Sequence, residues 1–115
     1  YEVGKQLAPL RKQGYLIVGS GNVVHNLRLV NWDSDHGSSE AIAFNNYITE
    51  AVERREDEKV IKFSTHKDAR YSVPTSDHFL PLLYVLGASD GKKITTFNNQ
   101  CELDSMAMTS YLIEE

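Results

Sequence analysis

Four histidines are the residues of this sequence best suited to chemistry at neutral pH. An imidazole titrates near neutrality, so it can serve as a metal ligand or as a proton carrier. His36 and His66 each lie in a polar stretch typical of a surface loop. His25 follows an apolar run and a glycine cluster, and His78 lies beside Asp77 before a second apolar stretch. We take His25 and His78 as functional candidates, the alternative being that both are partly buried, hydrogen-bonded side chains.

Several familiar kinds of site are excluded by the spacing of residues. No His-x-x-x-His or Glu-x-x-His pair is present, and the single cysteine, Cys101, cannot form a cysteine-based zinc site. The cluster Gly19–Asn22 lacks the lysine of a phosphate loop and the third glycine of a dinucleotide site. Ser20 also lacks the flanking pattern of a nucleophile elbow, so we interpret it as a turn residue.

Both candidate histidines are expected next to regular structure. The apolar run Tyr15–Val18 predicts a central strand covered on both faces, and Gly19–Asn22 can turn the chain sharply after it. His25 would then lie just beyond the carboxyl end of that strand, where open α/β sheets place ligands.

A helix is predicted over residues 78–86, where it would fix the side chain of the histidine at its start. Gly87 is a suitable end for this helix, and Pro81 falls in its first turn, where a missing N–H does little harm. Thr75 or Ser76 could cap its beginning.

The other predicted elements complete an α/β fold of strand, helix, helix and strands. The clearest is a helix over Glu40–Arg55, capped by Ser38 or Ser39. The remaining elements are a short or kinked helix limited by Pro9, a solvated charged run over Glu53–Lys59, and strands over Ile94–Phe97 and Met106–Ile113.

Length and composition describe one ordinary globular domain or a piece of one. The chain has 115 residues, 41% of them hydrophobic and 24% charged. Its net charge of −4 argues against a nucleic-acid partner, and no apolar run approaches the roughly 20 residues of a membrane span. The single cysteine indicates a reducing compartment, and we expect a cytoplasmic protein.

Two long strings resemble the class III extradiol ring-cleavage dioxygenases, in the 4,5-DOPA dioxygenase-like branch. They are Gly19–Arg28 (GSGNVVHNLR) and Val73–Ala88 (VPTSDHFLPLLYVLGA), and Ser105–Tyr111 is similar to the C-terminal strand of that group. The resemblance covers nearly the whole chain but only the C-terminal part of a family member, somewhat under half. It implies the C-terminal part of a central mixed sheet flanked by helices, with residues 1–115 as a fragment of one catalytic domain.

The resemblance also implies a reaction and roles for both histidines. These enzymes open a catechol ring next to its diol with dioxygen, using Fe(II) for turnover and sometimes holding Zn(II) as isolated. His78 corresponds to a metal ligand, and His25 to the catalytic acid/base that is also counted among the metal-site histidines. The implied partners are a DOPA-like catechol, dioxygen and the missing N-terminal half of the same protein.

One departure from the family limits this interpretation. The family's first metal histidines lie in its N-terminal half, one of them in a His-Gly-Ser-Pro-type string that is absent here. We therefore expect a fragment with half a metal site, not competent for catalysis by itself, whose exposed sheet edge could pair with another copy.

Two other hypotheses stay open. A non-catalytic relative of the Memo type would bind metal or a partner, and a zinc hydrolase would need a carboxylate base. Asp77 is expected to point away from His78, which disfavours the hydrolase. Arg28, Arg70 and Tyr71 are conceivable substrate contacts, although surface salt bridges are the expected role of the two arginines. Trp32 is expected to be a packing residue.

Overall fold

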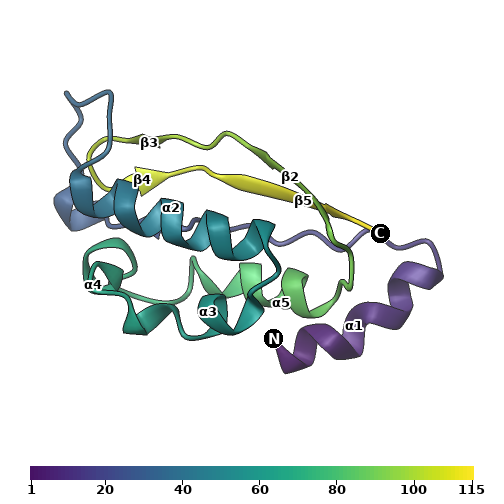
Figure 1. Ribbon diagram of the computed structural model, residues 1–115. Helices are drawn as coiled ribbons and strands as arrows, with labels where there is room; N and C mark the ends of the chain where they lie inside the picture. Colours follow the sequence, from purple (N-terminus) through teal and green to yellow (C-terminus); the bar gives the residue numbers. More distant parts are fainter.

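The computed structural model describes residues 1–115 as helices packed against two small sheets, which confirms the α/β class (Figure 1). Most of the helical residues lie between β1 and β2, and most of the strands are close to the C-terminus. In chain order the elements are α1 (Glu2–Lys12), β1 (Val24–His25), η1 (Leu27–Leu29), α2 (Ser39–Glu53), α3 (Asp57–Ile61), η2 (Phe63–Thr65), α4 (Ala69–Ser72), α5 (Leu80–Gly87), β2 (Lys93–Phe97), β3 (Cys101–Glu102), β4 (Met106–Ala107) and β5 (Ser110–Glu114).

The strands form two antiparallel groups. One sheet has the order β1-β4-β3, and the other pairs β2 with β5. The predicted strand over Ile94–Phe97 is confirmed, whereas the predicted strand over Met106–Ile113 is two strands, β4 and β5. The interruption falls at Thr109, whose buried hydroxyl donates to Asn45 Oδ1 at 2.7 Å. Because the Thr109 side chain is hydrogen-bonded to α2 at this point, the pairing of β4 with β1 is separated from the pairing of β5 with β2.

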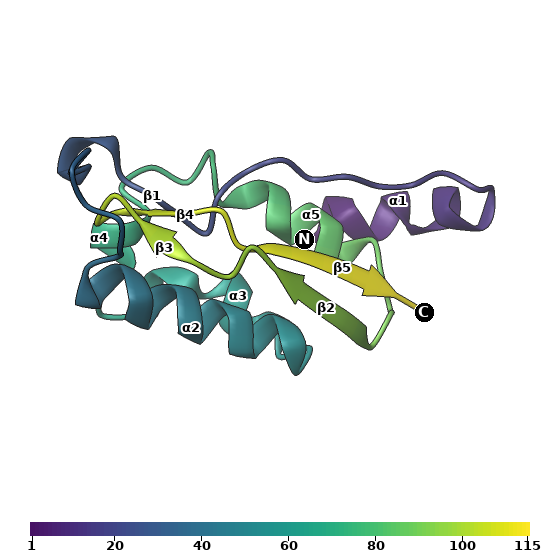
Figure 2. The same cartoon turned by 90° about the horizontal axis from the view of Figure 1, so that it is seen from above.

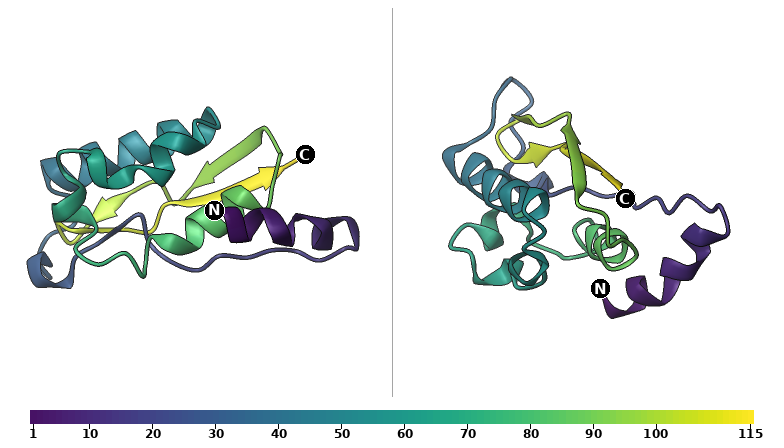
Figure 3. Two further views of the ribbon diagram at one scale, coloured as in Figure 1. Left: turned by 90° about the horizontal axis from the view of Figure 1, so that it is seen from below. Right: turned by 45° about the vertical axis from the view of Figure 1, so that its right-hand side comes forward.

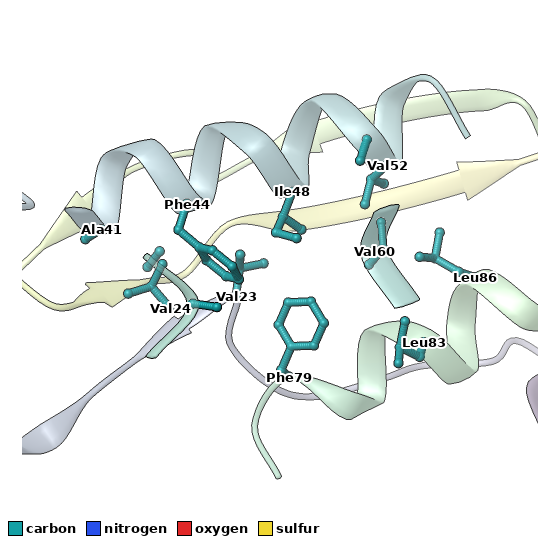
Figure 4. Packing of buried hydrophobic residues seen from close by; sticks show 13 residues of the cluster. Val23, Val24, Ala41, Phe44, Ile48, Val52, Val60, Phe79, Leu83 and Leu86 are labelled. Carbon is teal, nitrogen blue, oxygen red and sulfur yellow. The ribbon is translucent and has the colours of Figure 1, made fainter. Parts of the chain in front are cut away.

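Helix α2 confirms the clearest prediction from the sequence. Ser38 is its N-cap, and its Oγ accepts a hydrogen bond from the N–H of Ala41 at 3.2 Å. The apolar side chains Phe44, Ile48 and Val52 are fully buried along one face (Figure 4). This spacing of four residues places them one above the other toward the core.

The core joins α2 to the segment around His78. Phe79 is 1% exposed, and its ring lies 6.1 Å from that of Phe44 and 4.2 Å from that of Phe63, measured between centroids. Figure 4 shows Phe79 pointing toward the α2 side chains, with Leu83 and Leu86 continuing the cluster along α5. The residue next to His78 is therefore fixed by aromatic packing.

Helix α1 differs from its prediction, because it continues past Pro9 to Lys12. It packs against α5 at two glycines: a Cβ on Gly4 would lie 2.3 Å from Tyr84 O, and a Cβ on Gly87 would lie 2.2 Å from Tyr1 O. Glycine at these two positions lets the helix backbones approach closely.

The predicted buried strand over Tyr15–Val18 is wrong for this chain. These residues are extended but belong to no strand, and Leu16 and Val18 are 80% and 76% exposed. No backbone hydrogen bond is made by any residue of Leu16–Gly21. Figures 2 and 3 show this stretch as a coil beside α5. The apolar sequence favours a central strand, but a strand needs a neighbour to pair with.

The glycines that follow do not turn the chain as predicted. Residues 15–21 continue without a turn, and neither Gly19 nor Gly21 has a positive φ. A Cβ on Gly21 would lie 2.1 Å from His78 O, and one on Gly19 would lie 2.9 Å from Pro81 O. The glycines are needed because the backbone lies directly against the start of α5.

The charged run over Glu53–Lys59 is solvated only in part, which corrects the expectation. Arg55 and Asp57 have side chains only 15% and 14% exposed and form an ion pair at 2.9 Å. The Arg55 guanidinium also donates to the carbonyl groups of Leu86, Ser89 and Gly91. This charged run, which the sequence predicts to be solvated, therefore connects α2 and α3 to the end of α5 through hydrogen bonds.

No helix is long and apolar enough to span a bilayer.

Candidate functional site

The fold brings His25 and His78 together although 52 residues separate them in the sequence. Their ring centroids lie 3.6 Å apart, and the ring planes differ by 14°, so the imidazoles are stacked. His25 is the second residue of β1, and His78 lies in the turn before α5. The structure thus places the two sequence-predicted site residues side by side.

His25 is positioned by the sheet and by buried polar groups next to it. It pairs with Met106 in the antiparallel register of β1 and β4. Asn26, 5% exposed, donates from Nδ2 to Tyr71 O at 2.7 Å, and its N–H donates to Ser105 O at 3.0 Å. The fully buried Ser105 hydroxyl donates in return to Asn26 O at 2.6 Å. These hydrogen bonds hold the end of β1 and with it the imidazole.

His78 is held by the glycine-containing segment on one side and by α5 on the other. The N–H of Asn22 donates to His78 O at 2.7 Å, and Asn22 Nδ2 donates to Ala107 O at 3.1 Å. The caps predicted from Thr75 or Ser76 are wrong, because Phe79 is the N-cap residue of α5 and no side chain caps the helix.

Asp77 does not point away from His78, contrary to the expectation from the sequence. Its Oδ2 lies 3.5 Å from Nε2 of His78. A hydrogen bond from Thr75 is the main cause that lowers the pKa of Asp77, and the two histidines contribute to the same shift. The exposed carboxylate therefore stays ionised beside the imidazole pair.

The surroundings of His25 favour its neutral form. Burial lowers the pKa of His25, and the neighbouring His78 lowers it further, while a backbone hydrogen bond and Asp77 act in the opposite direction. A neutral imidazole is the form that binds a metal ion or accepts a proton.

The donor atoms of the histidine pair suit a metal ion in type but not in number. Two imidazoles fit a transition metal such as Fe(II) or Zn(II) in donor type. However, no group of three or more His, Cys, Asp or Glu side chains is placed to hold a metal ion. Protein metal centres of this kind use three or four ligands, so His25 and His78 fit the ion only together with further donors.

The other candidates lie apart from this pair. His36 is exposed as expected, whereas His66 is half-buried, with its ring 4.7 Å from that of Tyr47. Neither Arg28 nor Arg70 forms the expected ion pair. Trp32 is 78% exposed, so its predicted packing role is wrong.

The residues that fix the histidines were not singled out individually from the sequence. Three polar side chains donate hydrogen bonds to backbone carbonyl groups that lie 45 to 85 residues away in the sequence: Asn22, Asn26 and Ser105. The available signal was the position of the two asparagines next to glycine and histidine in an otherwise apolar stretch. Nothing in that signal names their distant partners.

The chain is similar to curated proteins named as extradiol dioxygenases and covers less than half of their length, consistent with a C-terminal part. The matching curated relatives are proteins named 4,5-DOPA dioxygenase extradiol: the one from Escherichia coli (strain K12) is 41% identical over 98% of this chain and 44% of its own length. The one from Beta vulgaris is 31% identical over 96% of this chain and 42% of its own length.

The structural comparison agrees. A crystal structure of an uncharacterized protein from Escherichia coli K12 matches with a TM-score of 0.85 and 38% identity, over 98% of this chain and 48% of that one. No family model matches the sequence. The resemblance stated from the sequence is confirmed, and the chain spans less than half the length of the curated relatives it matches.

Proposed function

We propose that this chain supplies part of the active site of an extradiol dioxygenase that opens a DOPA-like catechol ring with dioxygen. The observation that carries the proposal is the stacking of His25 on His78, 3.6 Å apart. The relatives named 4,5-DOPA dioxygenase extradiol support the same reaction class. A merely structural role would not require two imidazoles to stack on each other beside an ionised carboxylate.

The two histidines would have different tasks. His78 would be a metal ligand, and His25 would be the acid/base that also belongs to the metal site. Together with donors from outside this chain, the two imidazoles would hold a ferrous ion, which when bound would supply the redox chemistry for the reaction of dioxygen with the ring. Burial and the neighbouring His78 lower the pKa of His25, which favours the neutral imidazole that can accept a hydroxyl proton. The same burial favours releasing that proton later.

Oxygen uptake tests the proposal. A chimera would carry this chain in place of the matching part of the Escherichia coli relative, loaded anaerobically with Fe(II) and then given L-DOPA. We expect uptake and a coloured ring-opened product from the chimera, and none from the 115-residue chain alone. His25→Gln should reduce the rate by about 100- to 10,000-fold, since a proton carrier contributes on that order.

Two further variants separate the assigned roles from general damage. His78→Gln should lower the bound iron measured by elemental analysis as well as the rate. His36→Gln, in an exposed loop, should keep both. Iron bound to the chimera without uptake of oxygen across several catechols would contradict the proposal and favour a non-catalytic, metal-binding relative.

A further inference from the structure

An apolar groove runs beside the histidine pair. The segment Leu16–Val23 forms one wall, Thr109–Ile113 forms the other, and Phe79, Pro81 and Val85 lie along its floor. Its volume is about 390 Å³, and 11 of its 18 lining residues are hydrophobic. Figure 1 shows the two walls above α5, and Figure 2 shows them on either side of it. The N-to-C direction of one wall is opposite to that of the other.

Both walls carry backbone groups without partners. Leu16–Gly21 make no backbone hydrogen bond, and β5 pairs with β2 along one of its two edges only. Extended backbone with unpaired N–H and C=O groups is a template for another strand. Such groups in an apolar groove are satisfied best by pairing rather than by side-chain contact.

The side chains along the groove are exposed to an extent unusual for their type. Leu16 and Val18 are 80% and 76% exposed on one wall, and Phe97 and Leu112 are 48% and 46% exposed near the other. A continuous apolar surface of this kind marks a place where another segment packs.

We propose that the groove holds a β-strand from the part of the family's fold that this chain does not span. More than half the length of the matching relatives is unmatched, so ample chain exists to supply it. The strand would pair with Leu16–Gly21 on one side and with β5 on the other. Because the walls run in opposite directions, it is parallel to one and antiparallel to the other, and it joins them into a mixed sheet.

The same strand brings the missing part of the protein to the histidine pair. His78 lines the groove together with Asn22 and Gly21, so one end of the inserted strand lies beside His78. The inference rests on the shared fold, and it does not depend on the proposed reaction.

Hydrogen exchange measured by mass spectrometry tests the pairing directly. The 115-residue chain alone, at a concentration where it is monomeric, should exchange the amides of Leu16–Gly21 rapidly. In the chimera with the remaining part of the Escherichia coli relative, the same amides should exchange at least about 100-fold more slowly, because strand pairing must open first. No iron or substrate is needed, so the result is separate from any failure of oxygen uptake.

A matched pair of mild substitutions tests the apolar contact. Val18→Thr removes apolar contact from the groove wall, and Val3→Thr makes the same change on the exposed surface of α1, outside the groove. In the chimera, Val18→Thr should lower the midpoint of thermal unfolding by about 3 °C and Val3→Thr by less than about 1 °C. In the chain alone, neither should matter.

Three results would overturn the proposal. Slow exchange of Leu16–Gly21 in the monomeric chain alone would mean that the segment is already paired. Slow exchange that develops only as this chain self-associates, with none gained in the chimera, would make a second copy the occupant. Fast exchange in the chimera, together with equal effects of Val18→Thr and Val3→Thr, would leave the groove without a strand.

Discussion

At the scale of single residues, the stacked imidazoles limit each other's charge. Two protonated rings at 3.6 Å would repel, and burial adds a further penalty for charging His25. The structure therefore favours a pair in which His25 is neutral at pH 7, while the ionised Asp77 lies next to His78.

We predict that His25 titrates below its ordinary value of 6.5 when followed by NMR of the imidazole carbons. His78→Gln should raise the pKa of His25 but not restore it fully, because burial is the larger cause of the shift. A folded-state pKa below that of the unfolded chain means that the unfolded chain binds the proton first. The free energy of unfolding should thus decrease as the pH falls below about 6.5.

His36→Gln is the control for this titration, because His36 is exposed and apart from the pair. It should leave the pKa of His25 unchanged. A His25 that titrates at or above 6.5, or one that does not respond to His78→Gln, would contradict the stacked arrangement.

The two candidate histidines could be singled out from the sequence, while the groups that support them could not. His25 and His78 stand out by residue type and by the strings that contain them. The orientation of Asp77 depends on the turn before α5, which sequence spacing does not determine. The Asn26–Ser105 hydrogen bonds likewise depend on which strands pair.

At the scale of elements, Arg55 connects three helices after α2 ends. It has φ of 55°, its guanidinium binds both oxygens of Asp57, and it donates to three carbonyl groups around the end of α5. The charge is thus largely removed from water, and all three guanidinium nitrogens donate hydrogen bonds. Removing Arg55 would leave the acceptors, including the Asp57 carboxylate, without a partner.

We predict that Arg55→Ala lowers the free energy of unfolding by about 3–5 kcal/mol, because it leaves the largely buried Asp57 carboxylate without a counter-ion. Urea titration followed by circular dichroism measures the loss. The neighbouring Arg54 is the matched control, since its ion pair with Glu50 is exposed on both sides. Arg54→Ala should change the stability by less than about 0.5 kcal/mol. Equal losses of unfolding free energy in both variants would contradict a stabilising role for the hydrogen bonds of Arg55.

The elements that could be predicted are those whose signals are local. Helix α2 has its own cap and apolar face, and β2 has its own run of strand-favouring residues. The prediction for Tyr15–Val18 failed because a central strand is defined by its neighbours, which this chain does not supply there. Pro9 does not limit α1 as predicted, because packing against α5 supports the helix as far as Lys12.

At the scale of the whole molecule, stability depends on a small core that ends next to the site. Phe79 and Phe44 are the largest fully buried side chains, and Phe79 directly follows His78 in the chain. A loss of packing at Phe79 therefore affects both the fold and the position of the imidazole.

We predict that Phe79→Leu destabilises the chain by about 1–3 kcal/mol in thermal or urea unfolding, since a smaller side chain leaves a cavity in the core. Phe97→Leu is the matched control, because Phe97 is 48% exposed and should change the stability by less than about 0.5 kcal/mol. The NMR signal of His25 should shift in Phe79→Leu and stay in place in Phe97→Leu. The opposite order of effects would mean that the core lies elsewhere.

The two glycines at the contact between α1 and α5 fix the position of one helix along the other. Each of them faces backbone of the other helix, at Tyr84 and at Tyr1, where no Cβ fits. If α1 slid along α5 by one residue, Val3 or Lys5 would replace Gly4 in that contact and would collide with the carbonyl. The point at which the chain leaves α1 is consequently set to within one residue, and so is the depth at which the following extended segment passes the histidines.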